Sequence, residues 1–422
     1  MTDLLQPSKR FENLFFVALI LLFATPVLPQ ILKIAAIAFF VVVCLSEAIK
    51  NKPRFKWSFF LFNASLYIMY LLSVLYSQDM DYAFAKLEVA ASLLVFPLSF
   101  AVVSKSLIDS VIEKIKYLFY AYITAVLLVN IYLVASFLMD GNAWTQFIDY
   151  APYVNKLDNY PGIHSLYLSM HNAVAIIMVF YLLRTERVFK AGIPLFIVGF
   201  LLGIGLILLL KKGPVFALLV VTTLLSFRYK LIRVWAFYGV FIISLGSLLV
   251  AFPSTVQRFN QLLKMEKVAT TKNSAQIQKV VLNCAKEEME DAGIFGFGLG
   301  DGKGELIDCY GGVDQDLVNS SYNSHNQYIS LVLMVGFIGL FIFLAMLFFN
   351  VMNAVRSGVF ITIAFILFYA IVMFSENLLE RQEGVVYFAL LINLLYFLNK
   401  KNQQAVRRNP NQEELLKSIT NE

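Results

Sequence analysis

Charged residues are scarce in this sequence, and so are cysteines and histidines. Of the 422 residues, 15% are Asp, Glu, Lys or Arg and 59% are hydrophobic. Soluble domains have about 25% charged and about 45–50% apolar residues. The composition therefore excludes an ordinary water-soluble enzyme and indicates a membrane protein. With only three cysteines the chain cannot be a disulfide scaffold, and its three histidines leave few side chains that titrate near neutral pH.

Several motifs that carry chemistry are also missing. The sequence contains no P-loop, no His-Glu-x-x-His motif, no paired cysteines with zinc spacing and no EF-hand loop. We therefore expect no metal and no cofactor, so that the energy for any reaction comes from the substrate or from a gradient. Gly298 and Gly300 do not indicate a dinucleotide site, because no parallel strand and helix surround them. The basic residues form short clusters rather than one patch, and no nucleic-acid partner is expected.

Long apolar runs bounded by charged or turn residues predict the fold. A membrane-spanning helix needs about 20 apolar residues, and continuous runs favour helices over the alternating segments of a barrel. The sequence thus predicts an all-α polytopic membrane protein, with 1–422 forming a single transmembrane domain of about twelve helices. The first is expected to be a retained helix rather than a signal peptide, since no small-residue cleavage site follows Pro26 and Pro29. The predicted spans are 13–28, 31–48, 57–76, 83–103, 117–138, 162–183, 191–210, 214–229, 232–252, 326–350, 359–375 and 384–399.

The lysines and arginines of the short loops predict the orientation of the chain. Cytoplasmic loops of membrane proteins are enriched in these residues, and every second loop here is basic. Both termini are therefore expected in the cytoplasm, where 402–422 would form a polar, solvated tail. The clusters predicted to be cytoplasmic are Lys9/Arg10, Lys50/Lys52/Arg54/Lys56, Lys105/Lys114/Lys116, Arg184/Arg187/Lys190, Arg228/Lys230/Arg233, Arg356 and Lys400/Lys401/Arg407/Arg408.

One loop on the other side is large enough to fold. It covers 253–325, between spans nine and ten, and is polar with charges of both signs. Its stretch 274–291 has the apolar spacing of an amphipathic helix, and the glycines of 293–300 are expected to end that helix in a tight turn. The sequence therefore predicts a large periplasmic loop that contains short helices.

Two of the three cysteines fall in this loop. An oxidising compartment would allow Cys284 and Cys309 to form a disulfide. The alternative is a pair of free thiols that lie too far apart, because the sequence does not fix the separation of their Cα atoms. Cys44 lies inside a predicted span and is expected to be packed there.

Three cations on the external side are candidates for binding an anion. Lys211 and Lys212 lie in a short loop between spans seven and eight, where the orientation rule disfavours positive charge. Lysine binds phosphate as a point charge, and the alternative is that both side chains only extend to the membrane interface. Arg381 precedes the last span, and its alternative role is a salt bridge to one of the neighbouring acids Glu376, Glu380 and Glu383.

The histidines differ in their expected surroundings. His325 ends the large loop just before an apolar span, at the external boundary where an amphiphilic substrate presents its head group. An imidazole there suits proton removal from a sugar hydroxyl, whereas the alternative is a polar residue that only caps a helix. His164 and His171 are seven residues apart and share one face of the sixth predicted helix. We expect His164 to line the cavity and His171 to be packed and hydrogen-bonded.

The residues around His325 resemble a known family. The segment Asn323-Ser-His-Asn-Gln-Tyr-Ile-Ser-Leu-Val-Leu-Met-Val-Gly-Phe-Ile-Gly-Leu340 is similar to the His-Asn-x-Tyr and Gly-x-x-Gly segment of the O-antigen ligase and polymerase superfamily. Ile294-Phe-Gly-Phe-Gly-Leu-Gly300 resembles its Pro-Leu-Phe-Gly-x-Gly turn, and Lys212-Gly213 its Arg-Gly pair. The twelve-span plan with one large external loop also resembles the family's architecture, while the motifs lie within about 165–340.

The resemblance implies a metal-independent glycosyltransferase of the bacterial inner membrane with its site on the periplasmic side. Its donor would be a glycan on undecaprenyl diphosphate and its acceptor a glycolipid or glycan. His325 would be the catalytic histidine, with Asn326 or Tyr328 sharing the orientation of the acceptor. Lys212 would take the place of an arginine that binds the diphosphate. The cations that would assist it are Lys211, Arg258, Lys279 and Arg381.

The sequence leaves alternatives open for the acceptor of the glycan and for the class of protein. Transfer to lipid A–core would make the chain an O-antigen ligase, which we favour; transfer to another lipid-linked repeat unit would make it a polymerase, and a protein hydroxyl is a third acceptor. A transporter or flippase also has about twelve spans, but is expected to carry more ionisable residues near the middle of the bilayer. A structural membrane protein is the last alternative. We expect a monomer that contacts membrane lipids.

Overall fold

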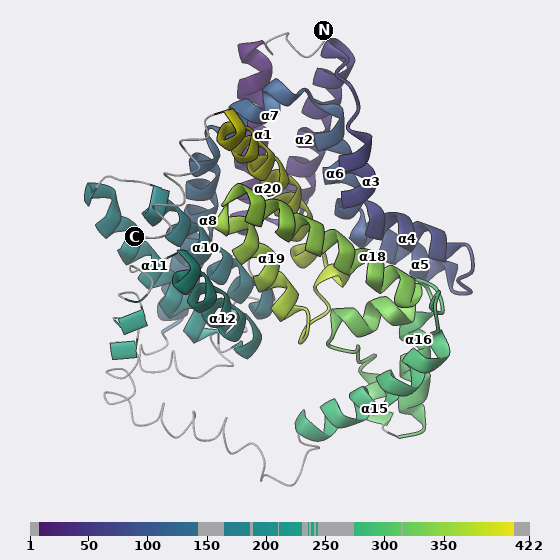
Figure 1. The fold of residues 1–422 in the computed structure, drawn as a ribbon. Coiled ribbons are helices and arrows are strands. Elements are labelled where there is room, and N and C mark those ends of the chain that lie inside the picture. Colours follow the sequence, from purple (N-terminus) through teal and green to yellow (C-terminus); the bar gives the residue numbers. More distant parts are fainter. Residues whose placement is uncertain are drawn as a thin grey trace.

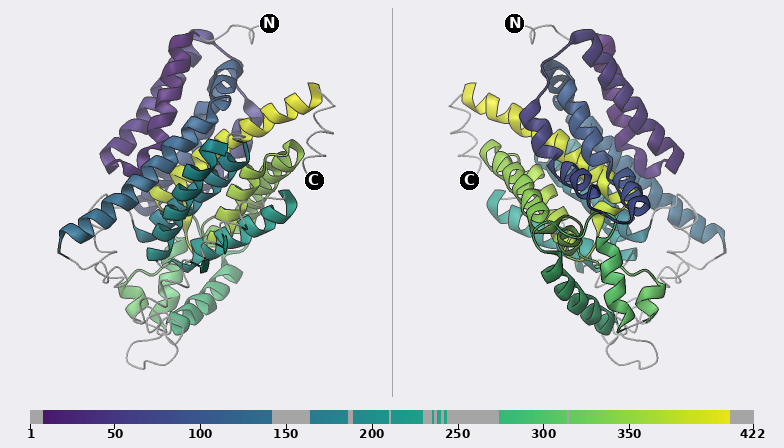
Figure 2. Two further views of the ribbon diagram at one scale, coloured as in Figure 1. Left: turned by 90° about the vertical axis from the view of Figure 1, so that its left-hand side faces the viewer. Right: turned by 90° about the vertical axis from the view of Figure 1, so that its right-hand side faces the viewer.

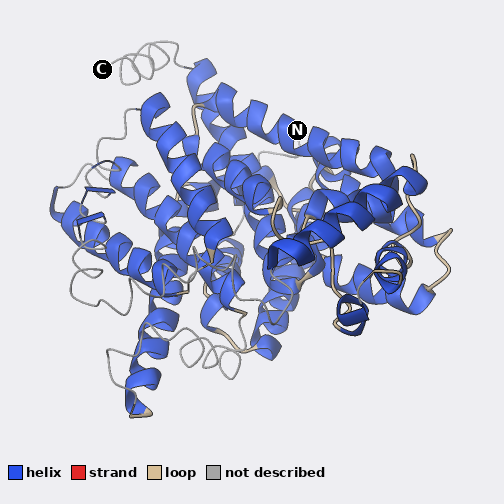
Figure 3. Cartoon of the chain, turned by 90° about the horizontal axis from the view of Figure 1, so that it is seen from below, coloured by secondary structure: helices blue, strands red, loops and turns tan. Residues whose placement is uncertain are grey.

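The computed structural model describes residues 8–141, 164–185, 189–209, 211–229, 235, 238–239, 242–243, 274–313 and 315–408. Within these ranges the chain is helical and contains no strand (Figure 3). The elements are α1 (Lys9–Phe23), η2 (Thr25–Val27), α2 (Gln30–Asn51), α3 (Trp57–Asn63), α4 (Ser65–Val74), α5 (Met80–Ala90), α6 (Ser92–Val102), α7 (Lys105–Ile112), α8 (Ile115–Met139), α10 (Ser165–Thr185), α11 (Phe189–Leu208), α12 (Lys212–Tyr229), α15 (Ser274–Ala292), α16 (Gly302–Gly311), α17 (Gln315–Asn319), α18 (Gln327–Ser357), α19 (Phe360–Val372), η4 (Leu378–Glu380) and α20 (Gln382–Arg408).

Within the described residues, the helices that meet the length and apolarity of a membrane span are fewer than the expected twelve. Five helices, α2, α8, α10, α18 and α20, are long and apolar enough to cross a membrane, and the count reaches seven if each of two bent helix pairs is one span. The all-helical membrane class is therefore confirmed, but the number twelve is not. The shorter helices α1, α11, α12 and α19 occupy four other predicted spans. The 13 residues of α19 extend about 20 Å, less than the ~30 Å of the hydrocarbon core. Most of predicted span 232–252 and the loop 139–161 lie outside the described residues, as do 253–273 and the tail from 409.

Two predicted spans are pairs of helices with a bend between them. The helices α3 and α4 meet at 60°, and α5 and α6 meet at 44°. A third predicted span, 326–350, is interrupted at Gly336, whose φ of 68° and ψ of −176° are not helical. Apolar runs do not reveal such breaks, because each run continues beyond the break and one or two polar residues within it are ordinary.

The basic clusters meet at one end of the bundle. Lys401 Nζ donates to the carbonyl of Asp109 and to Glu113 Oε1, each at 2.8 Å, and Lys105 Nζ donates to Gln404 Oε1 at 2.8 Å. All of these residues belong to segments that the sequence places in the cytoplasm or next to it. The helix α7 marks this end in Figure 1, while α15 and α16 lie at the opposite end, and both side views agree (Figure 2). The basic residues of these two segments therefore lie at one end of the bundle, and α15 and α16 lie at the other.

The core of the bundle surrounds α10. This helix is buried along almost its whole length and packs against α8, α11, α12 and α19. Inside it, His171 Nδ1 lies 2.7 Å from the hydroxyl of Tyr122, so the prediction of a packed, hydrogen-bonded histidine is confirmed. Cys44 is fully buried in α2, as expected.

The helices α15 and α16, which belong to the segment predicted to be external, form a small body of their own. The predicted disulfide is present: Cys284 of α15 and Cys309 of α16 are bonded, with their Cα atoms 5.8 Å apart. A second apolar cluster surrounds this bond and includes Leu306 and Tyr310 of α16 and Leu333 of α18. The amphipathic helix expected at 274–291 is α15, and the turn that ends it has positive φ at Gly293, Gly296 and Gly298. The disulfide and the apolar contacts together hold α15 and α16 against the start of α18.

Candidate functional site

The segment between α17 and α18 is held by a set of short-range hydrogen bonds. Asn326 is the N-cap of α18, and its Oδ1 accepts from the backbone N–H groups of Tyr328 at 2.9 Å and Ile329 at 3.2 Å. Asparagine is among the preferred residues at this position because its side chain satisfies the free N–H groups of the first turn. Ser324 Oγ donates to the carbonyl of Asn326 at 2.9 Å. The backbone N–H of Gln327 donates to the carbonyl of Met373 at 2.9 Å, which ties the segment to the end of α19.

His325 occupies an unusual backbone conformation in this segment. Its φ is +46°, a value that residues other than glycine rarely adopt. Such strain persists only where the surrounding structure holds it, and here the caps on both sides do so. The side chain is 44% exposed, with Nδ1 3.5 Å from Glu376 Oε2 and the ring centroid 4.7 Å from that of Tyr322. The geometry turns Nδ1 toward an acid, and within the described part of the chain the other ring nitrogen, Nε2, has no hydrogen-bond partner.

His325 and Lys212 line the same cavity, of about 490 Å³. The cavity is bounded by α12, α15, the segment 322–326 and the loop that follows α19, and Asn326 and Glu376 also line it. Gly213 allows the close packing of this wall, because a Cβ atom there would lie 2.7 Å from Ser375 Oγ. Lys212 is exposed and has no ion pair within 4.0 Å among the described residues. The cavity therefore combines a free cation, an imidazole and a carboxylate.

Glu376 acts electrostatically on its neighbours in the cavity. Burial raises the pKa of the Tyr322 hydroxyl, and the negative charge of Glu376 raises it further. Tyr322 therefore stays neutral near pH 7 and presents a hydroxyl beside the imidazole. The carboxylate of Glu376, 3.5 Å from Nδ1, also helps to orient the imidazole ring of His325.

The other predicted phosphate-binding cations are placed differently. Lys211 precedes α12 and is half-buried, but only Lys212 of the pair lines the cavity. Lys279 lies within α15, and Arg258 falls outside the described residues. Arg381 is exposed at the start of α20 and is not among the residues that line this cavity. The grouping of Arg381 with Lys212 is corrected here, since proximity in a predicted topology does not specify which side of a loop a residue occupies.

Arg381 belongs instead to a charged group around Glu380. Lys86 Nζ lies 2.6 Å from Glu380 Oε2, and Asn377 Nδ2 donates to Glu380 Oε1 at 2.6 Å. Burial alone would raise the pKa of Glu380, but the charge of Lys86 and the hydrogen bonds outweigh burial and hold the pKa below its ordinary value. Burial lowers the pKa of Lys303, and the positive charges of Lys86 and Arg381 lower it further against the effect of Glu380. The contacts of Glu380 with Lys86 and Asn377 hold η4 in place before α20.

Two residues expected to face the acceptor have structural roles. The hydroxyl of Tyr328 donates to the carbonyl of Ala370 at 2.7 Å, and its ring packs on Phe374 with centroids 4.6 Å apart. Tyr328 therefore anchors α18 to α19, because its position in the first helical turn directs it toward that neighbour. His164 is exposed before α10, where its carbonyl accepts from the N–H of Tyr167 at 2.9 Å, and it does not line the cavity. The expectation for Asn326 is met in part, since it lines the cavity but uses Oδ1 as a helix cap.

Sequence reasoning missed the roles of Glu376 and Tyr322. Glu376 was considered only as a partner for Arg381, yet it lies beside His325. The predicted topology could have indicated that Glu376 lies near His325, because it places the loop before the last span and the loop before span ten on the same, external side. Among the described residues, no group of three or more His, Cys, Asp or Glu side chains could hold a metal ion.

No protein-family model matches the chain. No curated protein matches it either.

Proposed function

We propose that this protein transfers a glycan from undecaprenyl diphosphate to an acceptor hydroxyl at the periplasmic face of the bacterial inner membrane. The observation that carries the proposal is the shared cavity of His325 and Lys212, with Glu376 3.5 Å from the imidazole. The sequence resemblance assigns a catalytic histidine and a diphosphate-binding cation to the same two positions. Two residues more than 100 positions apart in the chain thus line one cavity, as a shared reaction requires.

The reaction needs a base, an oriented acceptor and a neutralised leaving group. The acceptor oxygen attacks the anomeric carbon while the bond from that carbon to the diphosphate oxygen breaks, with inversion of configuration. The hydroxyl proton passes to Nε2 of His325, and Glu376 stabilises the resulting imidazolium through Nδ1. The bonding electrons leave with the diphosphate, whose charge Lys212 offsets.

The acceptor defines the name of the reaction. With lipid A–core as acceptor the protein is an O-antigen ligase, which is our first choice, and with a second lipid-linked repeat unit it is a polymerase. A reconstituted assay with one lipid-diphosphate glycan and each acceptor in turn separates the two, because only the productive acceptor gains the glycan. Absence of transfer to lipid A–core, to a repeat unit and to protein hydroxyls would contradict the proposal.

Transport is a second candidate, favoured by one observation. The bent pair α5 and α6 lies beside a cavity with charged side chains, a combination found in transporters. Sealed vesicles with a labelled lipid diphosphate and no acceptor test it directly. Movement of the label between leaflets without formation of a glycosidic bond would favour a flippase, whereas glycan transfer without such movement supports the enzyme.

The orientation of the chain is part of the proposal. Reporter fusions within 253–325 are expected to be active outside the cytoplasm, and fusions at both termini inside it. A cytoplasmic position for 253–325 would separate His325 from a periplasmic donor and contradict the mechanism.

A further inference from the structure

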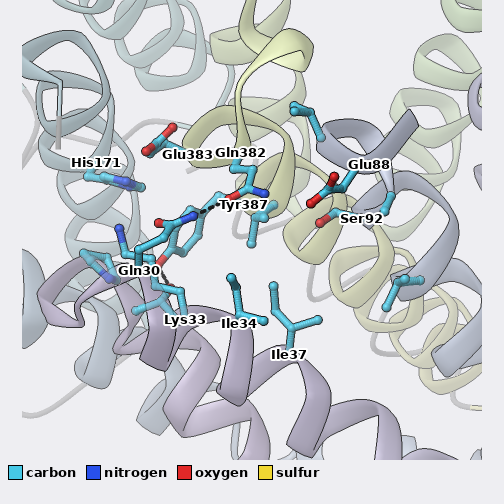
Figure 4. A pocket seen from close by; sticks show the side chains of 16 residues that line it. Gln30, Lys33, Ile34, Ile37, Glu88, Ser92, His171, Gln382, Glu383 and Tyr387 are labelled. Carbon is cyan, nitrogen blue, oxygen red and sulfur yellow. Dashed lines mark hydrogen bonds between the residues drawn. The ribbon is translucent and has the colours of Figure 1, made fainter. Parts of the chain in front are cut away.

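A second cavity lies among membrane-spanning helices, away from the residues of the proposed reaction. It has a volume of about 140 Å³, room for about ten water molecules, and is formed by α2, the junction of α5 and α6, α10 and the start of α20. Figure 4 shows Lys33, Glu88 and Glu383 around this space, each from a different helix. None of the three has been given a role in glycan transfer.

These three charged side chains lack partners of their own. Among the described residues, none makes an ion pair within 4.0 Å or a side-chain hydrogen bond. Glu383 is close enough to Lys33 to act on it electrostatically, but the two do not touch. Lys33 and Glu88 fall within predicted spans and Glu383 directly precedes one; an ionised side chain without a partner is costly inside a membrane, and such residues mark binding sites or pathways. Four other polar side chains of the wall are paired with each other, Gln30 with Gln382 (Figure 4) and Tyr387 with Thr25.

The backbone beside the cavity is irregular as well. The helices α5 and α6 bend by 44° between Ala90 and Ser92, and Ala91 and Ser92 line the cavity. Irregular backbone inside a bilayer is tolerated where it is buried in protein or lines a polar cavity. The break and the unpaired charges are independent observations, and they occur at the same place.

The cavity has an apolar edge beside its charged side chains, which suits an amphiphilic ligand. Ile34, on its wall, is 55% exposed and faces outward from α2, and Ile37 lies one turn further along (Figure 4). Acyl chains can therefore lie against α2 while a head group enters between the helices. The head group meets one cation and two carboxylates.

We propose that this cavity binds a lipid head group that carries both a phosphate and a primary ammonium, as in phosphatidylethanolamine. The phosphate would pair with Lys33 and the ammonium with Glu88 and Glu383, so that all three side chains gain a partner. A purely anionic head group would leave both carboxylates unpaired. A choline head group lacks N–H donors and cannot make the charge-assisted hydrogen bonds that a primary ammonium makes with carboxylates.

The test measures lipid binding and does not depend on glycan transfer. The full-length protein is purified in detergent, freed of bound lipid and titrated with phosphatidylethanolamine, phosphatidylcholine or phosphatidylglycerol of identical short acyl chains. The readout is the unfolding temperature as a function of lipid concentration. We expect half-saturation by phosphatidylethanolamine at a concentration at least tenfold lower than by the other two lipids.

Variants show whether this cavity is the site. The double variant Glu88→Gln with Glu383→Gln should lose the preference for phosphatidylethanolamine over phosphatidylcholine, and Lys33→Gln should weaken binding whereas Lys33→Arg keeps it. Glu287→Gln, on the exposed face of α15, is the matched control and should bind as the parent does. Equal half-saturation by the three lipids, tighter binding of phosphatidylglycerol, or a preference that survives in the double variant would overturn the proposal. The comparison of the three lipids on the parent protein tests the proposed head-group preference even if a variant does not fold.

Discussion

Gly296 and Gly336 lie against each other where the external turn meets the break in α18. A Cβ atom on Gly296 would lie 2.5 Å from the backbone nitrogen of Gly336, and one on Gly336 would lie 2.0 Å from the carbonyl oxygen of Ile294. Both residues have positive φ, 78° and 68°. The backbone N–H of Phe297 donates to the carbonyl of Leu333 at 2.8 Å beside this contact. The two glycines therefore join the turn after α15 to α18, one of the helices long and apolar enough to cross a membrane.

Gly336→Ala is expected to destabilise the protein. An alanine with this φ costs of order 1–3 kcal/mol in strain, and the overlap with the backbone of residue 294 adds to it. Thermal unfolding of the purified protein measures the loss. Gly304→Ala is the matched control, because Gly304 has open space around it and lies within α16, where alanine is the better helix former by about 1 kcal/mol. Equal stability of Gly336→Ala and the parent would show that the contact is dispensable.

Reduction of the disulfide is expected to loosen the external helices. The bond between Cys284 and Cys309 closes a loop with a sequence separation of 25, which corresponds to about 3 kcal/mol in the chain-entropy description. The measurement is the rate of limited proteolysis within α15 and α16 with and without reductant, with the double variant Cys284→Ser and Cys309→Ser as a second comparison. Cys44 is buried and free, so alkylation before denaturation should modify none of the three cysteines. Rapid alkylation of the native protein at Cys284 would contradict the bond.

The ion pair between Lys86 and Glu380 should produce a pH-dependent stability at low pH. The pKa of Glu380 in the folded protein lies below the ordinary value of 4.5. The stabilisation is therefore fully present above about pH 4.5 and is lost as the pH falls through the lower folded value. Glu380→Gln leaves the Lys86 ammonium, only 16% exposed, without its partner, and should cost about 3–5 kcal/mol near pH 7.

Unfolding temperatures measured between neutral and acidic pH test this expectation. The difference between the parent and Glu380→Gln should shrink below pH 4.5. The control is Glu113→Gln, because the pair of Glu113 with Lys401 is exposed and should contribute little. A difference between parent and Glu380→Gln that stays constant down to the acid limit would rule out the assigned ionisation.

Lys212→Ala should reduce glycan transfer without harming folding. The side chain is exposed at the cavity and buries little area, so that expression and membrane insertion are expected to be unchanged. Loss of one hydrogen bond to a charged group corresponds to about 1.5–3 kcal/mol, which is about a 10- to 150-fold loss of activity. Lys212→Arg keeps the charge and should retain more activity. Equal activity of Lys212→Ala and the parent on a lipid-diphosphate donor would refute its role.

The helices were largely predictable from the sequence because a membrane requires long apolar runs. Helix α15 and the glycine turn after it were also predictable, since their signals are local. The breaks at Gly336 and between Ala90 and Ser92 were not, because a short irregular stretch leaves the apolar run intact. The number twelve is not confirmed, because some of the apolar runs, such as that of α19, form helices shorter than a membrane span needs.

The candidate site was predictable only where its residues carry a motif. His325 and Lys212 were identified from their neighbours in the sequence, and the structure brings them to one cavity. The contact of His325 with Glu376 depends on how two loops approach each other, which no local pattern encodes. Lys33 and Glu88 were counted within apolar spans, so the sequence did not reveal that they face a common cavity.

In the proposed reaction, the imidazole of His325 removes the proton of the acceptor hydroxyl. Removal of this imidazole should then lower turnover by about 10²–10⁴-fold, the usual contribution of a positioned acid–base group. Glu376→Gln keeps the size of the side chain but removes the charge beside Nδ1, and should lower turnover less and displace the acidic limb of the pH profile. Both variants keep the backbone caps at Ser324 and Asn326.

The most direct test is a reconstituted transfer assay across pH with equal amounts of the parent protein, His325→Ala and Glu376→Gln. The account predicts a loss of at least about 100-fold for His325→Ala, together with the disappearance of the ionisation that limits the parent at low pH. Near-parental turnover of His325→Ala with an unchanged pH profile would contradict the account and remove His325 from the mechanism.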